Sequence, residues 1–381
     1  MSAAPAKNKV IAFVSNSAWS VYNFRLDVIR HLVQRGYHVI VLAPDDEYSS
    51  NLVRSGCRFI PIDFNNKSAN PLLDYFFYRK LKAIYKSQRP DFIFHYVVKP
   101  NIYGSLAAAS LNIPSVAVIT GFGYPFAKRN WLYWVVKQLY KKALKKTTQV
   151  WFLNNEDAKV FIHEKIVQIE KVKVLPGEGI NTDFFSPDYN SPKKKDAPFT
   201  FIMSTRLLKS KGVGLYADAA RILKKKNYDT RFLLIGFFEK NHPDSISREE
   251  MSRWENEGLI YYKGFAKDVR PYLDQADCLV FPSFYHEGVP RCLMEASSME
   301  LPIITSMNKG CREVVLNNST GYLCNVNDPF DLADKMEKMI NLSVEERNRM
   351  GKNGRLLVVK KFNVAKIIDE YEDTLNHDLP D

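Results

Sequence analysis

The sequence contains little cysteine, and its five cysteines follow no pattern that predicts a metal site or a disulfide framework. No Cys-x-x-Cys pair and no cysteine–histidine spacing of a zinc site occurs. The cysteines are widely separated and lie mostly inside apolar stretches, at Cys57, Cys278, Cys292, Cys311 and Cys324. We interpret them as reduced core residues of a cytosolic protein.

Long hydrophobic runs are also missing. Residues 1–9 contain no apolar stretch that could act as a secretory signal. The longest apolar region, residues 91–127, is interrupted by Lys99, Pro100 and Pro114. Because a membrane-spanning helix needs about twenty consecutive apolar residues, we expect neither a signal peptide nor a transmembrane helix.

Several ligand-binding patterns are absent as well. No Asp-x-Asp occurs, which argues against a divalent metal that holds a diphosphate. The Gly-x-Gly at Gly121 lacks the third glycine and the opening helix of a dinucleotide fingerprint, which argues against a Rossmann oxidoreductase. No RNA-binding, helix-turn-helix or zinc-finger pattern is present, so we expect no nucleic acid partner.

The length and the charge of the chain are informative in themselves. At 381 residues the chain is longer than one hydrophobic core usually organises, which predicts two domains. Its net charge is +12, and residues 1–190 carry 25 Lys and Arg against 14 Asp and Glu, a balance of +11. A one-sided basic excess indicates an anionic partner, such as a membrane surface or a phosphorylated substrate.

Short apolar β-branched runs alternate with amphipathic segments along the whole chain. The runs begin with KVIAFVSN and YHVIVLAP and resume after residue 198 with FTFIMSTR, RFLLIG and CLVFPS. Continuous apolar strands of this kind suit parallel sheets that helices cover on both faces. The pattern predicts an α/β fold of two doubly wound, Rossmann-like domains that face each other across a cleft.

A polar segment rich in Pro and Lys, which begins at Ser186, separates the two halves of this pattern. We therefore place the first domain at residues 1–185 and the second at residues 186–361. The last helical segment, residues 362–381, follows the end of the second sheet pattern and is expected to dock back on the first domain.

Two glutamates eight positions apart form the densest chemical signal. Glu287 precedes an expected helix that opens near Val289, and Glu295 lies about two turns inside it. Carboxylates beside a helix N-terminus accept hydrogen bonds from the vicinal hydroxyls of a sugar or a ribose, while the backbone N–H groups bind anions. The alternative is that Glu287 caps the helix and Glu295 is a solvated helical residue.

Two basic residues follow the first expected strand of the second half. Arg206 comes directly after FTFIMST, and Lys211 precedes a glycine in the same loop. Cleavage of a sugar–diphosphate bond leaves negative charge on the departing phosphate, which preorganised cations stabilise. Arg binds phosphate oxygens bidentately and Lys acts as a point charge. The alternative is a solvated basic loop.

These segments resemble the retaining GT-B glycosyltransferases of family 4. FPSFYHEGVPRCLMEASSMELPIITS resembles their E-x7-E motif, STRLLKSKG their donor-phosphate motif, and GCREVV and NSTGYL the segments that follow. VVKPNIYGSLAA and TGFGYPF are similar to the branch that extends polyprenyl-diphosphate-linked sugars in making bacterial surface glycans. The resemblance covers nearly the whole chain. It departs from the family at Glu300, where a glycine is common, and at Ser17 and Ala18, where many members have paired glycines.

The resemblance implies a role for each matching residue. Arg206, Lys211 and Glu287 would form the catalytic group, with Glu287 at the hydroxyls of the donor sugar and Glu295 at the ribose. Further donor contacts would come from Ser17, Gly288, Val289 and Pro290. Glu313, in GCREVV, lies either near the site or at the start of a helix. The resemblance implies a UDP-sugar as co-substrate and no cofactor. No divalent metal is expected either, because the sequence has no Asp-x-Asp and the family uses Arg and Lys at the diphosphate.

Four residues at the ends of strands in the first half are placed on the acceptor side. His95 and Lys99 follow DFIF, and Gly121 and Tyr124 belong to TGFGYPF. Residues directly after a strand face the ligand edge of an open parallel sheet. His95 has the alternative of an ordinary buried histidine with satisfied hydrogen bonds.

A basic and aromatic helix is predicted at residues 128–146, where seven basic residues and no acidic ones occur. Lys137, Lys141 and Lys145 fall on one stripe at helical spacing, next to Trp131 and Trp134. Such a helix suits the headgroup zone of an anionic membrane, and DYFFYRKLKAIYKSQR has the same character. The alternative is a solvated helix whose aromatic residues complete the core.

Together with these observations, the resemblance implies a retaining glycosyltransferase. It would move a hexose or N-acetylhexosamine from a UDP-sugar to a polyprenyl-diphosphate-linked saccharide, at the inner face of the cell membrane. One alternative is the same donor chemistry on a lipopolysaccharide-core or soluble glycan acceptor. Another is a sugar-nucleotide-binding subunit without catalysis.

Overall fold

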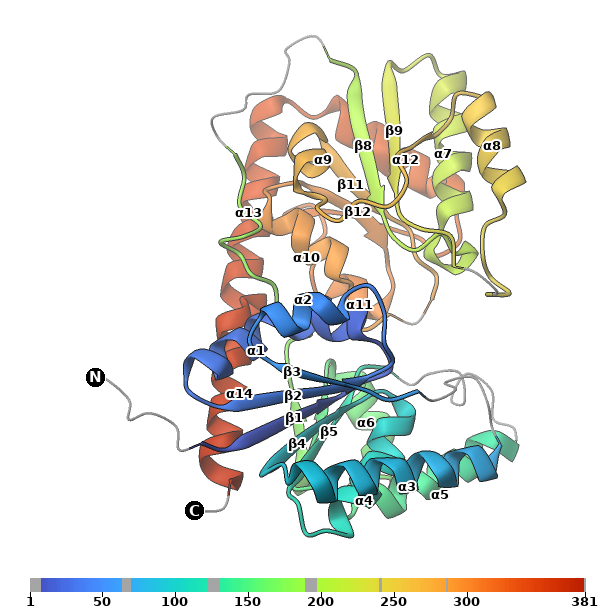
Figure 1. The fold of residues 1–381 in the computed structure, drawn as a ribbon. Helices are drawn as coiled ribbons and strands as arrows, with labels where there is room; N and C mark the ends of the chain where they lie inside the picture. Colours follow the sequence, from blue (N-terminus) through green and yellow to red (C-terminus); the bar gives the residue numbers. More distant parts are fainter. Residues whose placement is uncertain are drawn as a thin grey trace. The chain divides into compact units, whose positions relative to one another are not determined.

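The computed structural model describes residues 8–63, 70–121, 131–188, 197–239, 242–285 and 287–379 (Figure 1). The chain forms two compact units. The first comprises Met1–Gly179 together with Val364–Asp381, and the second comprises Ile180–Asn363.

The first unit is built on a parallel sheet in the order β3-β2-β1-β4-β5-β6-β7. Its strands are β1 (Val10–Val14), β2 (His38–Ala43), β3 (Arg58–Pro61), β4 (Phe92–Tyr96), β5 (Ser115–Ile119), β6 (Gln149–Phe152) and β7 (Val172–Val174). The central strands β1, β4 and β5 are buried along almost their whole length, which explains their continuous apolar sequences.

Helices cover both faces of this sheet, with α1, α2 and α14 on one face and α3, α4 and α5 on the other (Figure 1). The helical elements are α1 (Ala18–Gln34), α2 (Ser49–Arg54), α3 (Pro71–Gln88), the π-helix η1 (Pro100–Gly104), α4 (Ser105–Ala109), α5 (Trp131–Leu144), α6 (Asn155–His163), the 3-10 turn η3 (Ile169–Lys171) and α14 (Val364–Asp378). Local sequence sets where helices begin: Asn70 caps α3, whose first residue is Pro71.

The second unit contains a parallel sheet in the order β10-β9-β8-β11-β12-β13. Its strands are β8 (Phe199–Ser204), β9 (Thr230–Ile235), β10 (Tyr261–Tyr262), β11 (Cys278–Phe281), β12 (Ile303–Ser306) and β13 (Gly321–Cys324). The helical elements are the 3-10 turn η4 (Lys209–Lys211), α7 (Val213–Lys225), α8 (Arg248–Asn256), α9 (Arg270–Gln275), α10 (Arg291–Ser298), α11 (Lys309–Arg312), α12 (Pro329–Asn341) and α13 (Val344–Phe362). Helix α7 packs against α12, and α10 packs against α13.

The predicted fold class is confirmed, because both units are Rossmann-like parallel sheets with helices on their faces. The boundaries of the units differ from the predicted ones by a few residues. Phe185 belongs to the core of the second unit, and Arg355 donates hydrogen bonds to the carbonyls of Thr182 and Phe185. The second unit therefore begins at Ile180 rather than at residue 186, since these contacts hold the preceding residues against it.

Within the described residues, no helix is long and apolar enough to cross a membrane. The five cysteines form no disulfide, and four of them are buried. Burial raises the pKa of the Cys57 thiol to about 11 and that of Cys311 to about 12, so both thiols stay protonated at neutral pH.

Candidate active site

The loop after β8 carries Arg206 and Lys211, and hydrogen bonds from a neighbouring loop hold its shape. The backbone N–H of Ser210 donates to the Asp244 carboxylate at 3.0 Å, and the N–H of Lys209 donates to the Asp244 carbonyl at 2.8 Å. Arg206 is half-buried at the end of the strand and pairs with Glu239, with 3.3 Å between Nη1 and Oε2. The predicted phosphate-binding loop is therefore well ordered, with a guanidinium at its open end.

Lys211 is buried and contacts Glu287 directly. Its Nζ lies 2.6 Å from Oε1 and 2.8 Å from Oε2 of that carboxylate. The next residue, Gly212, has a φ of +83°, and a Cβ there would meet the Pro282 carbonyl oxygen at 2.3 Å. A glycine is thus required after Lys211, because only glycine allows this close approach.

Glu287 has a second hydrogen-bond partner that the sequence analysis missed. The Ser283 hydroxyl is buried after β11 and lies 2.6 Å from Oε1 of Glu287. The Ser283 carbonyl in turn accepts hydrogen bonds from Ser306 and from Asn308. The sequence could have indicated this contact, because Ser283 follows an apolar strand and precedes Glu287 by four residues.

The loop that contains Glu287 and Gly288 lies against the segment that begins at Gly310. A Cβ on Gly310 would lie 1.3 Å from the Gly288 carbonyl oxygen, so no side chain fits there. This close approach explains why GCREVV begins with a glycine. Val289 and Pro290 lead into α10, whose N-terminus has Pro290 as cap and no side-chain cap hydrogen bond.

Glu295 lies on α10 and is mostly buried, paired with Arg291 at 2.8 Å between Oε1 and Nε. Glu313 follows the end of α11 and pairs with Lys361 of α13. The interpretation of Glu313 as the start of a helix is wrong, because it is the C-terminal cap of α11. The partly exposed ion pair with Lys361 gives Glu313 a structural role that requires no ligand.

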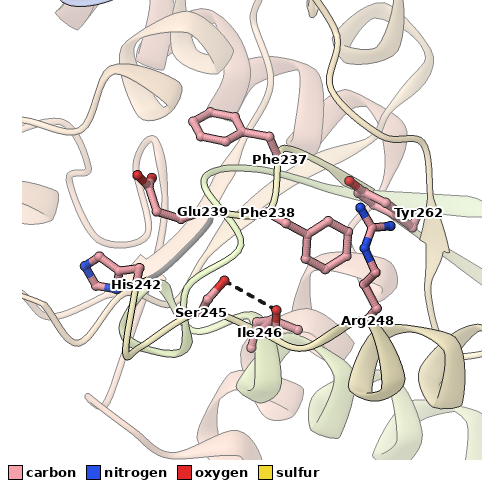
Figure 2. Close-up of a pocket in the computed structure, with 8 residues that line it drawn as sticks. All are labelled: Phe237, Phe238, Glu239, His242, Ser245, Ile246, Arg248 and Tyr262. Atoms are coloured by element: carbon pink, nitrogen blue, oxygen red, sulfur yellow. Dashed lines mark hydrogen bonds between the residues drawn. The ribbon is translucent and has the colours of Figure 1, made fainter. Parts of the chain in front are cut away.

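A cavity of about 530 Å³ opens beside Arg206, at the ends of β9 and β10 (Figure 2). Its lining residues are Phe237, Phe238, Glu239, His242, Ser245, Ile246, Arg248 and Tyr262. The volume is within the range of small-molecule sites. Glu239 both lines the cavity and pairs with Arg206, so the cavity adjoins the cationic loop. Figure 2 shows the Phe238 ring and the Tyr262 side chain close to the Arg248 guanidinium, which lies 4.8 Å from the Phe238 ring centroid.

The residues assigned to the acceptor side lie in different surroundings. His95 is fully buried inside β4, where Nε2 lies 3.0 Å from the Tyr85 hydroxyl and Nδ1 lies 3.3 Å from the Ser105 hydroxyl. Burial lowers the His95 pKa to about 3. The prediction that His95 faces an open cleft is therefore wrong, because the strand continues past it and its ring completes the interior.

Lys99 remains at the ligand edge of the first sheet. It pairs with Asp74 of α3 at 2.6 Å and lines a cavity of about 240 Å³. The preceding segment is strained: Val97 has a φ of +64°, which is costly for a β-branched residue, and a π-helix follows it. Strain and π-helical turns occur often at functional sites. Gly121 follows β5, and among the described residues no atom lies within 4 Å of where its Cβ would be; Tyr124 lies outside the described residues.

Ser17, predicted as a donor contact, is the N-terminal cap of α1. Its hydroxyl oxygen accepts a hydrogen bond from the Ser20 N–H at 3.1 Å. This contact gives Ser17 a local role at the end of β1 that needs no ligand.

The membrane assignments divide along α5. Trp131 and Trp134 are exposed at the start of the helix, and Lys145 is exposed just beyond its end, whereas Lys141 is half-buried. Lys137 is buried and forms an ion pair with Glu164, so its assignment to a membrane-facing stripe is wrong. The inner face of α5 carries Tyr133, Val136 and Tyr140, which places Lys137 on that face.

Among the described residues, no group of His, Cys, Asp and Glu side chains is arranged to hold a metal ion. The site of the second unit thus combines a half-buried guanidinium, a buried ammonium with its carboxylate partner, and a cavity that adjoins the same loop. These groups follow β8, β9 and β11, at the carboxyl edge of a parallel sheet, where open α/β sheets bind ligands.

Comparisons with known proteins identify the family of the chain. The family described as "Glycosyl transferases group 1" matches residues 186–357, and "Glycosyl transferase 4-like" matches residues 10–154. The chain is 32% identical to the N,N'-diacetylbacillosaminyl-diphospho-undecaprenol alpha-1,3-N-acetylgalactosaminyltransferase of Campylobacter jejuni, over 87% of this chain and 89% of the relative. It is 29% identical to the UDP-Gal:alpha-D-GlcNAc-diphosphoundecaprenol alpha-1,3-galactosyltransferase of Escherichia coli, over 86% of this chain and 84% of the relative.

Solved structures show the same fold. A glycosyltransferase of Rickettsia africae superimposes with a TM-score of 0.81 at 19% identity, over 98% of this chain and 99% of that one. HepE of Anabaena, solved with UDP and glucose, also gives 0.81, at 18% identity over 97% of this chain and 100% of that one. The chain is a glycosyltransferase of the GT-B fold. It belongs to family 4, together with relatives that act on undecaprenyl-diphosphate-linked sugars.

Proposed function

We propose that this enzyme transfers a hexose or N-acetylhexosamine from a UDP-sugar to a polyprenyl-diphosphate-linked saccharide, with retention of anomeric configuration. The observation that carries the proposal is the contact of Lys211 with both oxygens of Glu287, at 2.6 and 2.8 Å, on the loop that also presents Arg206. A diphosphate and a sugar hydroxyl are the groups that such a cation–carboxylate pair recognises together.

Donor binding redistributes these contacts. In the structure, Arg206 is paired with Glu239 and Lys211 with Glu287. When the diphosphate arrives, its oxygens become partners of both cations, and Glu287 becomes available to accept a hydrogen bond from the donor sugar. Ser283 keeps a hydrogen bond to Glu287 throughout and therefore maintains its orientation.

The chemical step follows from the same charges. The bond between the anomeric carbon and the β-phosphate oxygen breaks, and the acceptor hydroxyl oxygen bonds to that carbon from the same face. The acceptor proton passes to the departing phosphate oxygen, so no protein base and no covalent sugar–enzyme bond is needed. Arg206 and Lys211 stabilise the negative charge that develops on the UDP, and they do so without a divalent metal.

The acceptor assignment is supported by the two bacterial relatives, whose names specify undecaprenyl-diphosphate-linked sugars. We place the acceptor at the ligand edge of the first sheet, near Lys99 and Gly121. Because the acceptor lipid resides in a membrane, we also propose that the enzyme binds the inner face of the cell membrane peripherally. Exposed Trp131 and Trp134 support this, together with basic Lys141 and Lys145 at the other end of α5.

Calorimetric titration with UDP, GDP and NAD in the presence of EDTA tests the donor assignment. We expect UDP to bind without metal, and Arg206→Ala to abolish binding. Lys209→Ala is the matched control, because Lys209 lies on the same loop but is exposed. If none of the three nucleotides binds, the chain is a subunit without donor chemistry, and the proposal fails.

Turnover of a lipid-linked and of a free saccharide tests the acceptor assignment. We expect the lipid-linked acceptor to react faster. Equal rates would replace it by the alternative in which a soluble glycan or a lipopolysaccharide-core sugar receives the hexose.

A further inference from the structure

Large apolar side chains are exposed on two helices of the first unit. On α3, Leu72 is 69% exposed and Phe76 is 65% exposed. On α5, Trp131 is 69% exposed and Trp134 is 54% exposed. Leu73, Tyr75 and Val135 enlarge the same two areas. Clusters of this size on the surface of a protein mark an interaction site.

Each helix continues from its apolar beginning into a basic end. The exposed residues that follow on α3 include Arg79, Lys80 and Lys86. Lys142 is exposed on α5, and Lys145 and Lys146 are exposed just beyond its end. Over both helices, all of whose residues are described, Asp74 is the one acidic residue, and it is turned inward to pair with Lys99. The exposed faces of both helices therefore carry apolar, basic and a few neutral polar side chains, such as Ser87 and Gln138, but no acidic one.

The two helices belong to one layer. Both α3 and α5 pack against η1 and α4, on the same face of the sheet (Figure 1). Tyr103 of η1 packs against two core clusters, one that includes Leu81 of α3 and one that includes Val136 of α5. The exposed sides of α3 and α5 thus flank a common support.

The topology also aligns the two helices with each other. Every strand pair of this sheet is parallel, so a helix that connects two strands runs back against them. The N-terminal ends of α3 and α5 therefore lie at the carboxyl edge of the sheet. This is the edge at which open α/β sheets bind their ligands. Leu72, Phe76, Trp131 and Trp134 all lie toward that edge, and the basic ends point away from it.

We propose that the exposed faces of α3 and α5 form one platform that docks on an anionic lipid bilayer. The apolar side chains at the carboxyl edge enter the interfacial zone, and the lysines and arginines lie over the lipid phosphates. The platform rests on the proposed function, since it would place the acceptor edge of the first sheet against the bilayer that holds the lipid-linked substrate.

The charge of the platform favours an anionic bilayer over a second copy of this chain as its partner. Two copies of this platform placed face to face would bring five or more basic side chains of each against the other, with no exposed acid on either helix to pair with them. An anionic lipid surface neutralises these charges, and the aromatic rings of Phe76, Trp131 and Trp134 can insert between its headgroups.

Sedimentation with vesicles tests the platform. The lipids are phosphatidylcholine alone or phosphatidylcholine with phosphatidylglycerol, and the protein is the full chain. We expect binding to require phosphatidylglycerol. Leu72→Ser with Phe76→Ser should weaken binding by about tenfold or more, and Trp131→Ser with Trp134→Ser should weaken it to a similar extent. The control is Phe330→Ser with Leu356→Ser in the second unit, which removes side chains that are 74% and 69% exposed and should leave binding unchanged.

A second measurement places α3 at the bilayer. Phe76→Trp, in a chain that also carries Trp131→Phe and Trp134→Phe, supplies a fluorescent reporter on α3, and lipids brominated on the acyl chain should quench its emission relative to the same chain without Phe76→Trp. Vesicle binding by the Leu72→Ser, Phe76→Ser protein at the wild-type level would overturn the proposal, since α5 alone would then suffice. A dimer that this variant loses in sedimentation velocity, with vesicle binding unchanged, would identify the surface as a contact between two copies and also overturn it.

The platform and the proposed transfer can fail separately. UDP titration decides the donor chemistry of the second unit, and vesicle sedimentation needs no donor. We expect the α3 variant to keep the UDP affinity of the wild type.

Discussion

At the scale of the residue, Lys209 and Lys211 stand on the same turn in different surroundings. Lys211 is buried against the carboxylate of Glu287, whereas Lys209 is exposed, 3.8 Å from Glu250. We expect Lys211→Ala and Arg206→Ala each to cost about 2–4 kcal/mol of transition-state stabilisation, because each removes a preorganised cation from the leaving phosphate. The measurement is kcat/KM for the UDP-sugar, with Lys209→Ala as the control. Near-normal turnover of Lys211→Ala would place the diphosphate elsewhere.

The Ser283 hydroxyl hydrogen-bonds Glu287 and, at 3.2 Å, the Ser210 carbonyl, but neither of the cations assigned to the diphosphate. Its removal should therefore separate the orientation of Glu287 from donor binding. Without the hydroxyl, Glu287 loses one of its hydrogen bonds and its preferred position. We expect Ser283→Ala to lower kcat/KM by about tenfold, near the worth of one hydrogen bond to a charged group. The Kd for UDP should stay at the wild-type value. If affinity and turnover fall together, Ser283 supports the whole loop rather than the carboxylate.

His95 gives the first unit a dependence on pH. Its pKa is about 3 in the folded protein, because burial disfavours the imidazolium, and it rises to the ordinary value of 6.5 on unfolding. The unfolded chain then binds the proton more readily, so stability is complete above pH 6.5 and is lost as the pH falls toward 3. Between pH 7 and pH 5 the loss from this residue is about 2 kcal/mol.

Denaturant unfolding at pH 7 and pH 5 tests this dependence. We expect His95→Asn to be less stable than the wild type at pH 7 but to lose less stability on acidification. His38→Asn removes an exposed histidine and serves as the control. Equal acid sensitivity of the wild type and His95→Asn would mean that the imidazole is charged inside the fold.

At the scale of the element, the type of each segment could be predicted from sequence, but its rotation about the helix axis could not. Short continuous apolar runs rich in β-branched and aromatic residues indicate buried parallel strands such as β1 and β8, because a buried helix would need a longer run. Helix α5 is different, since it has large apolar residues on its exposed face as well as on its inner face. Its periodicity is therefore ambiguous, and Lys137 was assigned to the wrong face.

Polar groups inside elements were the second source of error. His95 lies at a strand end in the sequence, yet its ring is enclosed by Tyr85 and Ser105, which come from α3 and α4. Such a contact depends on segments ten residues away on either side and has no local signature. In contrast, the family resemblance already placed Lys211 and Glu287 in one site, where the structure brings them into contact. The residue types alone did not exclude that Lys211 belongs to a solvated basic loop.

Glu300 lies at the C-terminal end of α10, where its backbone conformation can be tested by substitution. It follows the cap of α10 with a φ of +59°, and its N–H donates to Ser297 while that of Leu301 donates to Ala296. This is the Schellman arrangement, in which glycine is favoured. We expect Glu300→Gly to stabilise the second unit by about 1 kcal/mol and Glu300→Ala to give no such gain. Unfolding midpoints in urea provide the comparison, and a less stable glycine variant would show that side-chain contacts of Glu300 outweigh the backbone strain.

At the scale of the whole molecule, the chain's last segment completes its first unit. Tyr371 of α14 is buried, with its ring centroid 4.6 Å from that of Phe94 and 4.8 Å from that of Trp151. Its hydroxyl lies 2.6 Å from that of Tyr96, whose ring faces the Arg25 guanidinium at 4.2 Å. The first unit is therefore not complete until residues after the second unit have folded against it.

This dependence on α14 predicts a graded and selective loss of stability. Tyr371→Ala should cost about 3–5 kcal/mol, the usual cost of removing a buried aromatic ring. Tyr371→Phe should cost about 1 kcal/mol, because it removes only the hydrogen bond to Tyr96. The second unit lacks these contacts, so the Kd of UDP should be unchanged in both variants at temperatures where the first unit remains folded. Thermal unfolding followed with and without UDP checks both statements. A parallel fall of UDP affinity with stability across the two variants would mean that the donor site depends on the first unit, and that the two units act as one folding body.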